Sequence, residues 1–553
     1  MASTNREVHS REALRRLISA CLAFCSLSAV SPAAGEPDSH WKDWRNRRRA
    51  ELAALPKPAV PASSEEQVID RFLFAYWTKN KIARPTVAED RIYARRVYLD
   101  VTGLLPTIEQ LDRFVADRNP RKREKLVDSL LSDRDAYAEH WMTFWNDLLR
   151  NDEQTNIDGL RKPITGWLYA SLRHNKPLDL FVTELLDPGP DGPDGYLKGV
   201  NWRGQVNASQ TPPIQAAQNV SQVFLASSLK CASCHDSFIN DLKLVQAYGL
   251  ASFFSDKNLE MHRCDKATGK IVAPKFLYPG LGEIAPNADL KARHRAVSEM
   301  VTRPDNPRFA KTMVNRLWKR LLGRGLFEPI DDYDGNLSNR ELLEWLAYDF
   351  IIHDYDVKHT LRQILLSRVY QAPVSQSQPV KAKELTPLKG PVARKMSSEQ
   401  YLDAISQVTE YWPKTDVMKV NVANPHVRAW LHKKPDALAV ALGRPTREQV
   451  CTERSQESTV LQALELVNGS VLANQLEGGA KSLLGTKLGQ EKNPETVLST
   501  IYKRALGRLP TAEEASLLRS LVGSVQDSRE QRQKGWEDLL WVLVMTPEFQ
   551  FIE

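Results

Sequence analysis

Apolar residues recur at helical spacing along most of the chain, and this pattern limits the possible folds more than any other feature. Ile69, Phe72, Leu73 and Tyr76, for example, would share one face of a helix. Runs that alternate between apolar and polar residues, as strands do, are scarce. The sequence therefore predicts a mainly α protein. The expected helices cover 86–101, 108–117, 122–131, 135–150, 164–171, 177–186, 214–230, 339–353, 358–369, 397–411, 458–484, 494–506, 511–525 and 529–546.

Breaks in this pattern predict two helical domains linked by an irregular segment. The chain has 553 residues, which is long enough for two domains. We expect an N-terminal helical domain at 63–256 that carries the Cys-x-x-Cys-His motif. An irregular connecting segment, 257–305, follows the motif and leads to a C-terminal helical domain at 306–553. Residues 36–62 are charged and then rich in Pro and Ala, so they are expected to form a tether. Polar residues near 372–390 predict a linker inside the second domain.

The second domain is predicted to begin with a helix whose two ends are marked in the sequence. Asn306 precedes Pro307, and proline suits the first turn of a helix. Apolar residues then follow at helical spacing until Gly323, which favours the end of a helix.

The first 35 residues predict a signal peptide. Arg11, Arg15 and Arg16 form a basic start, an apolar run follows at 17–30, and small residues come next. The apolar run would span about 21 Å as a helix, which is short of a membrane core of roughly 30 Å. No later segment is long and apolar enough for a transmembrane helix. We therefore expect an exported, periplasmic or extracytoplasmic protein with no transmembrane helix in the mature chain.

Charge and motifs argue against several classes of protein. The net charge of +7 is small for this length, and no concentrated basic face with interleaved aromatic residues is present, so nucleic-acid binding is not expected. The sequence lacks the Gly-x-Ser-x-Gly motif of many serine hydrolases and the glycine-rich loop of nucleotide-binding enzymes.

The motif that carries chemistry is Cys231-Ala-Ser-Cys234-His235. Two thiols at this spacing lie on one side of a turn and can form thioethers with haem, while the following histidine binds the iron. Two alternatives remain open. Cys231, Cys234 and His235 could bind zinc together with Cys264. The two thiols could also act as a bare redox pair, although the preceding residues 223–229 follow a helical pattern and not the expected strand.

Residues downstream of the motif are candidate ligands. Met261 or His262 could bind the haem iron from the second side, as in an electron carrier, whereas an open position would suit ligand chemistry. Cys264 is the candidate metal ligand beside His235. These downstream residues could equally be packing or surface residues. Asp236 either orients a ligand or lies at a helix end.

Acidic residues in the second half have two interpretations. Glu328, Asp331, Asp332 and Asp334 follow a glycine turn, where carboxylates can serve acid–base chemistry but more often cap helices or face solvent. Glu453-Arg454 is expected to form a local ion pair.

Several segments besides the motif resemble one known family. They are Arg96–Pro106, Gln222–Leu225, Ala247–Phe254, Asn306–Ala310, Asn315–Trp318, Gly323–Gly325, Glu328–Asp332, Glu453–Ser455, Asn468–Gly469 and Thr546–Phe549. The chain resembles a planctomycete-type cytochrome-c-like family with paired domains of unknown function, numbers fifteen-forty-nine and fifteen-fifty-three. The resemblance implies an exported protein with a Cys-x-x-Cys-His segment and no established reaction. Relatives often carry a second histidine where this chain has Ser237, and Arg263–Lys266 resembles a segment found in a subset of them.

The expected function is that of an exported haem c protein that transfers electrons to a redox partner protein not identified by the sequence. The alternatives are an enzyme acting on an exported substrate such as a polysaccharide, and a protein with a structural metal such as zinc at the Cys/His site.

Overall fold

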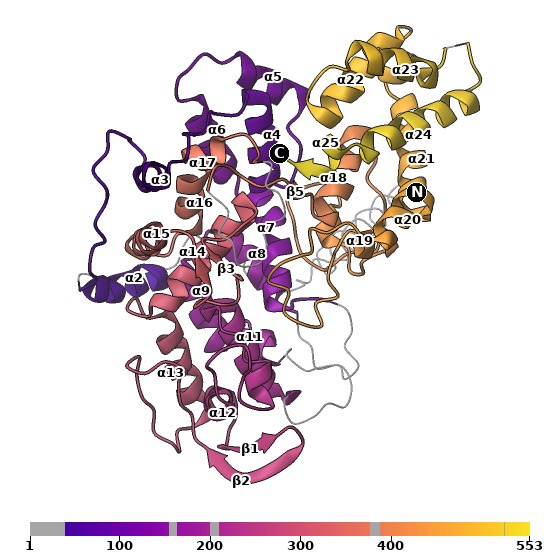
Figure 1. Cartoon of the computed structure of the whole chain (residues 1–553). Helices are drawn as coiled ribbons and strands as arrows, with labels where there is room; N and C mark the ends of the chain where they lie inside the picture. Colours follow the sequence, from indigo (N-terminus) through magenta and orange to yellow (C-terminus); the bar gives the residue numbers. More distant parts are fainter. Residues whose placement is uncertain (1–38, 53, 154–162, 199–209, 376–387, 525) are drawn as a thin grey trace, which may run out of the picture. The chain divides into compact units, whose positions relative to one another are not determined.

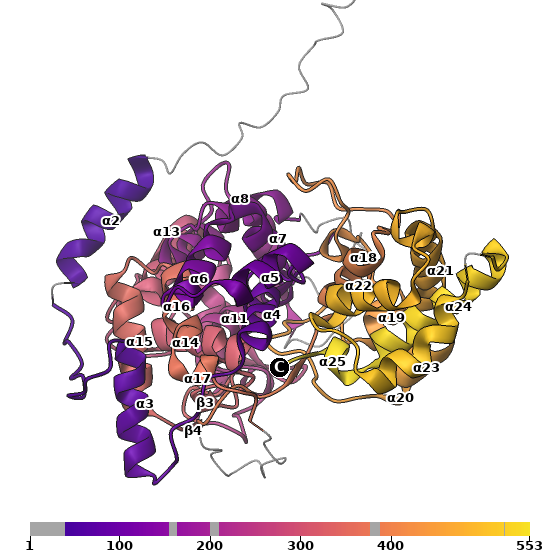
Figure 2. The same cartoon turned by 90° about the horizontal axis from the view of Figure 1, so that it is seen from above.

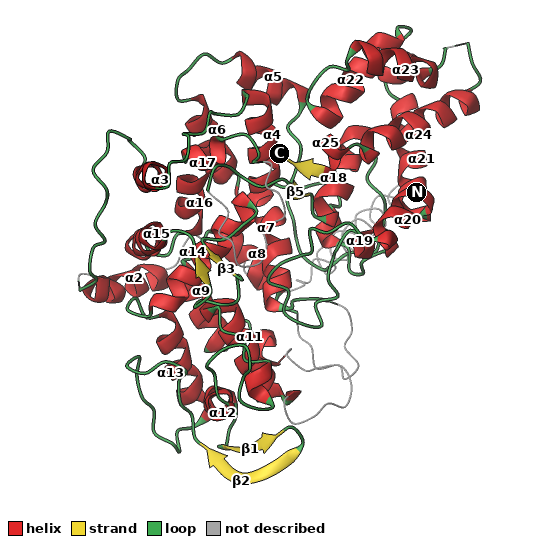
Figure 3. Ribbon diagram, in the orientation of Figure 1, coloured by secondary structure: helices red, strands yellow, loops and turns green. Residues whose placement is uncertain are grey.

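Helices make up most of the described chain, so the mainly α prediction is confirmed (Figures 1 and 3). Residues 44–553 form one unit, which is described by itself. The predicted signal peptide, 1–35, and most of the predicted linker at 372–390 lie outside the described residues. The computed structural model describes residues 39–52, 54–153, 163–198, 210–375, 388–524 and 526–553.

Polar side chains cap the starts of two of the helices before the cysteine motif, α5 (Ile108–Ala116) and α7 (Arg134–Leu149). The Thr107 hydroxyl accepts a hydrogen bond from the Gln110 amide, and the Asp133 carboxylate accepts one from the Ala136 amide. The helices before the motif are α2 (Ser39–Leu52), α3 (Val68–Lys79), α4 (Asp90–Val101), α5 (Ile108–Ala116), α6 (Lys122–Ser132), α7 (Arg134–Leu149), α8 (Thr165–Arg173), α9 (Leu178–Leu186), α10 (Gly195–Lys198) and α11 (Pro212–Leu225).

The helix predicted after Asn306 is confirmed at both ends. The Asn306 side chain accepts a hydrogen bond from the Arg308 amide, and Gly323 ends the helix with a left-handed φ of 78°. The helices from the motif onward are α12 (Leu244–Ala251), α13 (Leu290–Thr302), α14 (Pro307–Leu322), α15 (Arg340–Ile352), α16 (Val357–Leu365), α17 (Arg368–Gln371), α18 (Ser398–Thr409), α19 (Ala437–Ala441), α20 (Val460–Asn468), α21 (Ser470–Leu484), α22 (Pro494–Leu506), α23 (Ala512–Val522), α24 (Arg529–Met545) and α25 (Pro547–Gln550). No helix among the described residues is long and apolar enough to cross a membrane.

The described strands form antiparallel pairs. Strands β1 (Leu259–Arg263) and β2 (Lys266–Val272) form a hairpin after α12. Short pairs join β3 (Phe327–Glu328) to β4 (Asn336–Leu337), and β5 (Arg394–Lys395) to β6 (Phe551–Ile552). The last pair fastens the end of the chain beside α18.

Two hydrophobic cores lie within residues 44–553. The first is built mainly by α3 to α17 and contains Trp77, Trp145 and Trp318, and the second is built mainly by α18 to α25 around Trp536. Figures 1 and 2 show these two groups of helices beside each other. Helices α14, α15 and α16 contribute to the first core. The division between the cores therefore does not fall at residue 306, where the sequence places its domain boundary.

Residues 257–305, predicted to be irregular, contain the β1–β2 hairpin and helix α13. The hairpin escaped prediction because most of β2 faces solvent and carries no apolar alternation. Its turn is formed by Cys264, with a φ of 52°, and Asp265. The Asp289 carboxylate caps α13 by accepting a hydrogen bond from the Ala292 amide. The proline- and glycine-containing stretch between the hairpin and α13 has no helix or strand.

The predicted tether, 36–62, contains a helix over most of its charged half. The Trp44 indole donates a hydrogen bond to the Asp179 carboxylate at 2.7 Å, and the Arg48 guanidinium donates one to the Thr302 hydroxyl. These contacts join α2 to distant residues, so composition alone could not reveal them. The Pro/Ala-rich stretch that follows α2 has no helix or strand.

Candidate functional site

The cysteine motif forms a single helical turn between α11 and α12. The 3-10 turn η2 spans Cys231–Ser233, and the amides of Cys234 and His235 both donate hydrogen bonds to the Cys231 carbonyl oxygen, at 3.1 and 3.2 Å. Cys231, Cys234 and His235 are half-buried, while the two residues between the cysteines are buried. The turn thus supports the three side chains predicted to form the site.

The His235 ring is held by a backbone contact. Its Nδ1 lies 2.7 Å from the carbonyl oxygen of Asp236, and the ring stands 4.6 Å from the Phe238 ring. A carbonyl can only accept, so this contact places the proton on Nδ1 and leaves the lone pair on Nε2. A histidine fixed in this way is prepared to bind a metal through Nε2.

Asp236 was predicted either to orient a ligand or to lie at a helix end, and the structure places it at a helix end. Its carboxylate accepts a hydrogen bond from the Leu244 amide at 3.0 Å, in the first turn of α12. A negative side chain at this position stabilises the positive end of the helix dipole. The contact also connects the motif to the helix that supports the hairpin.

The β1–β2 hairpin brings Cys264 to the motif. The Cys264 amide donates a hydrogen bond to the Cys234 carbonyl oxygen at 3.0 Å. Met261 is half-buried and packs against the first core, whereas the His262 Nδ1 lies 3.1 Å from the Glu260 carbonyl oxygen. The hairpin therefore brings the downstream candidates close to the motif, and Met261 lies where the pairing of β1 with β2 is irregular, between Glu260 and His262.

Tyr248, on α12, is a residue of this site that sequence reasoning missed. Its side chain is 3% exposed, and its buried hydroxyl lies beside the His262 backbone without forming a hydrogen bond. Burial raises the pKa of the Tyr248 phenol, the His262 backbone lowers it in part, and the neighbouring Cys234 raises it. A buried hydroxyl without a partner is costly, so it indicates a place where another group can supply one. The sequence offers no signal for this, because a tyrosine at helical spacing reads as core.

The four thiols and His235 do not assemble a compact metal site. All four described cysteines are free thiols. No three of the side chains of Cys231, Cys234, His235 and Cys264 bring their ligand atoms within 4.8 Å of one another. A zinc site would need these atoms to converge on one point, whereas a haem group is large enough to be reached from separate points.

Two apolar side chains beside the motif are open to solvent. Phe238 is 87% exposed and Ile239 is 71% exposed. Large apolar side chains that are exposed next to each other commonly mark a place of contact. Here they flank His235 directly.

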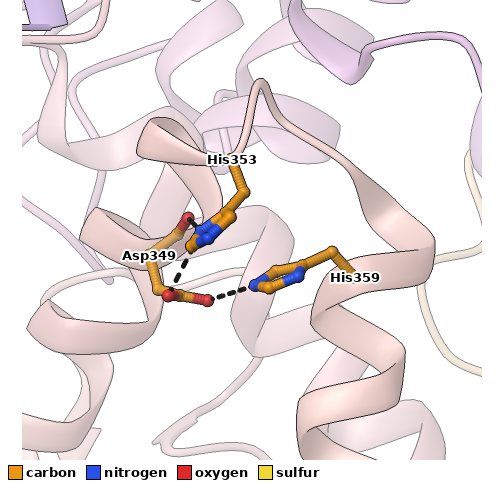
Figure 4. A group of neighbouring side chains, drawn as sticks. All are labelled: Asp349, His353 and His359. Carbon is orange, nitrogen blue, oxygen red and sulfur yellow. Dashed lines mark hydrogen bonds and ion pairs between the residues drawn. The ribbon is translucent and has the colours of Figure 1, made fainter.

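The described residues contain one cluster of histidine and carboxylate groups close enough to hold a metal ion, and it lies elsewhere: Asp349, His353 and His359 (Figure 4). The two imidazole rings stack with centroids 3.9 Å apart and planes only 19° apart. An ion must lie near the plane of each ring that binds it, so rings stacked in this way cannot share one. The His359 Nε2 instead lies 2.8 Å from the Asp349 carboxylate, which fastens α16 to α15.

The acidic residues after the glycine turn are held in structural contacts. Glu328 accepts a hydrogen bond from the Gly325 amide and pairs with Lys319, and Asp331 pairs with Arg316 at 2.8 Å. Asp334 forms a surface pair with Arg308. These contacts fit the structural interpretation of the carboxylates.

The predicted local ion pair between Glu453 and Arg454 is wrong. Glu453 pairs with Lys319 at 2.7 Å, while Arg454 pairs with Asp147 at 2.7 Å and with Glu399 at 2.6 Å. The two adjacent side chains point away from each other, and each forms ion pairs with residues far away in the sequence.

Arg454 belongs to a second candidate site, a cavity of about 100 Å³ where the two cores meet. Four arginines line it, and we call it the arginine pocket. They are Arg316 and Arg320 of α14, Arg394 of β5, and Arg454. Asp100 of α4 and Asp147 of α7 also line it.

Two family models match the chain. Residues 68–258 match PSCyt2, a protein of unknown function (DUF1549), and residues 293–522 match PSD1, a protein of unknown function (DUF1553). The chain carries both of these paired domains. The cysteine turn lies near the end of the PSCyt2 domain, and the hairpin lies between the two matched segments. No curated protein and no solved structure matches the chain.

The arginine pocket joins the two domains. Asp100 and Asp147 come from the PSCyt2 domain, whereas Arg320, Arg394 and Arg454 come from the PSD1 domain. The pocket therefore exists only when both domains are folded together, and neither domain contains it alone.

Proposed function

We propose that this chain is an exported haem c protein that transfers electrons, with the haem attached to Cys231 and Cys234 and bound by His235. The observation that carries the proposal is the geometry of the motif. One helical turn presents both thiols, and the His235 ring is fixed through Nδ1 so that Nε2 remains available.

Several neighbouring residues fit a haem group at this place. The buried Tyr248 hydroxyl, beside Cys234, forms no hydrogen bond with the described residues, and Phe238 and Ile239 offer apolar surface next to His235. Haem c would supply a reversible one-electron carrier when bound. The protein's part is to hold the His235 ring in one orientation and to limit solvent on that side of the turn, both of which tune the reduction potential.

The hairpin is the proposed source of the second axial ligand. It follows α12 directly and is hydrogen-bonded to the motif through the Cys264 amide. Because an axial position accepts one side chain, we propose that either Met261 or His262, and not both, binds there. The alternative in which Cys264 completes a zinc site with the motif requires the four side chains to move together.

The proposal is tested by measuring whether haem is covalently attached to the motif. The full-length chain is produced in a host that attaches haem c, and its intact mass and absorption spectrum are measured before and after acid–acetone extraction. Wild type should keep one haem, each single variant, Cys231→Ala or Cys234→Ala, should keep only one thioether, and the double variant should lose the haem on extraction.

Cys451→Ala is the matched control, because this thiol lies at the arginine pocket, and it should keep the haem. A wild-type mass without haem, together with one zinc per chain that is lost in Cys264→Ala, would replace the haem proposal by the zinc alternative. Sequencing of the exported chain tests the signal peptide, with the new N-terminus expected between Ala34 and Glu36. A retained Met1 would contradict export with cleavage.

A further inference from the structure

Arg320 is the unusual cation of the arginine pocket. It lies in the last turn of α14, and its side chain makes no hydrogen bond or ion pair within the described residues. The other arginines of the pocket all have partners. Arg316, for example, binds Asp331 and two carbonyl oxygens of α11.

The carboxylates around Arg320 are already occupied. Asp100 accepts two hydrogen bonds from Arg394, at 2.9 and 2.8 Å, and a third from the Tyr370 hydroxyl. On the other side, Asp147 accepts hydrogen bonds from Arg454 and Arg447. The nearest negative charges are therefore shared with other arginines and leave Arg320 without a counter-charge of its own.

The electrostatic surroundings of Arg320 show the same imbalance. Burial lowers the pKa of its guanidinium to about 10, and the charges of Arg394 and Arg454 lower it further than Asp100 and Asp147 can offset. The group still stays protonated at neutral pH, because its pKa remains about three units above 7. Arg320 is half-buried, so its charged guanidinium can bind an anion that enters the pocket from solvent.

The cavity beside Arg320 can accommodate such a ligand. Its volume of about 100 Å³ exceeds what a single water needs by several fold, and it suits a small group and not a bulky one. Thr452, Gln400 and Gln456 add neutral polar groups to its lining. Most of the charged groups in the wall donate hydrogen bonds, so the ligand must accept them.

We propose that the arginine pocket binds a small oxyanion group, a carboxylate, sulfate or phosphate, with Arg320 as its principal partner. The planar guanidinium binds two oxygens of such a group side by side, and a lysine in its place would offer a single point charge. The pocket draws on both domains, so the bound anion would also stabilise their contact. This inference does not depend on haem at the cysteine motif.

The experiment measures anion binding to the full-length chain by calorimetry and by the unfolding temperature. Sodium acetate, sulfate and phosphate are titrated separately to about 10 mM at constant ionic strength with chloride, which keeps general salt effects equal. At least one of them should bind wild type saturably and raise its unfolding temperature. The anion that does so identifies the chemical source of the oxyanion.

Arg320→Met should weaken binding of that anion at least about tenfold, because it removes a charge-assisted pair. Without the anion, this variant should unfold at the same temperature as wild type or higher, because it removes a cation that the charges of Arg394 and Arg454 oppose. Arg320→Lys should bind with intermediate affinity and guards against failure of the methionine variant to fold. Arg308→Met is the control, since Arg308 lies on the same helix but pairs with Asp334 outside the pocket.

The control should bind the anion as wild type does. The proposal is overturned if no anion binds wild type saturably, or if Arg320→Met binds as tightly as wild type. It is also overturned if Arg320→Met lowers the unfolding temperature without the anion, because Arg320 would then be a structural group with partners of its own.

Discussion

The cysteine turn takes its side chains from residues 231–264, whereas the arginine pocket collects Asp100, Asp147, Arg320, Arg394 and Arg454 from segments spread along most of the chain. The first site is half-open to solvent and carries few charges. The second lies where the two cores meet and is crossed by buried ion pairs.

The two sites differ in the interactions that form them. The turn is fixed by hydrogen bonds between residues a few positions apart, so it depends little on distant packing. The pocket depends on every segment that contributes to it, and a buried ion pair with one partner removed leaves the other charge uncompensated. We therefore expect damage to the pocket to affect the stability of the fold, and damage to the turn to affect mainly what the turn binds.

The largest expected effect comes from breaking the pocket's network at Glu399. This buried carboxylate accepts two hydrogen bonds from Arg454, at 2.6 and 3.0 Å. Glu399→Gln should lower the free energy of unfolding by about 3 kcal/mol, measured by denaturant titration, because Arg454 keeps its charge and loses a counter-charge. Glu477→Gln is the matched control and should cost less than about 0.5 kcal/mol, because the Glu477–Lys481 pair is exposed.

The same variant also tests how the stability of the fold depends on pH. Burial by itself would raise the pKa of Glu399, but Arg454 and the neighbouring arginines outweigh burial and hold that pKa far below its usual range. A depressed carboxyl pKa contributes stability above the unfolded-state value of about 4.3, and this contribution is lost as the pH falls below it. Wild type and Glu399→Gln should therefore converge in stability between about pH 4.5 and 2. Parallel curves over that range would contradict the role assigned to Glu399.

A second expected contrast separates the pocket thiol from the hairpin thiol. Burial raises the pKa of the Cys451 thiol to about 11, compared with about 8.5 for an ordinary cysteine. At pH 8 its alkylation by iodoacetamide should be about a hundredfold slower in the folded chain than in urea, because the thiolate is the reactive form. Cys264 is exposed and should react early, as followed by peptide mass spectrometry. Equal rates for the two thiols would mean that the pocket is open.

A smaller effect is expected at the hairpin, in the haem-loaded protein. Met261→Ala and His262→Ala should differ, because a single axial position accepts only one of the two side chains. The variant that removes the iron ligand should shift the reduction potential by on the order of 100 mV and allow carbon monoxide to bind. The other variant should behave as wild type. If wild type already binds carbon monoxide fully and neither change has an effect, the hairpin does not supply a ligand.

The smallest expected effect is that of Tyr248→Phe. Removing a buried hydroxyl without a partner should raise the free energy of unfolding of the haem-free chain by up to about 1 kcal/mol. In the haem-loaded chain the change should be zero or unfavourable, because the hydroxyl would then have a partner. A loss of stability in the haem-free chain would show that the hydroxyl is already hydrogen-bonded there.

Features of the fold that depend on neighbouring residues could be predicted. The ends of α14 were predicted from Asn306, Pro307 and Gly323, because a cap acts within one turn of its helix. The hairpin could not be predicted, since β2 is stabilised by its pairing with β1 and not by an apolar face of its own. Helix α2 was missed for a related reason, because Trp44 and Arg48 are fixed by Asp179 and Thr302.

The candidate sites divide in the same way. The sequence by itself determined the helical character of the chain and the spacing of Cys231, Cys234 and His235, because both are matters of periodicity within a few residues. It could not show that Glu453 and Arg454 pair with different residues, or that the Arg320 side chain has no partner among the residues that the structure describes. Only the tertiary structure decided these points. An ion pair depends on the distance and burial of its two charges, and those are set by packing between segments that lie far apart in the chain.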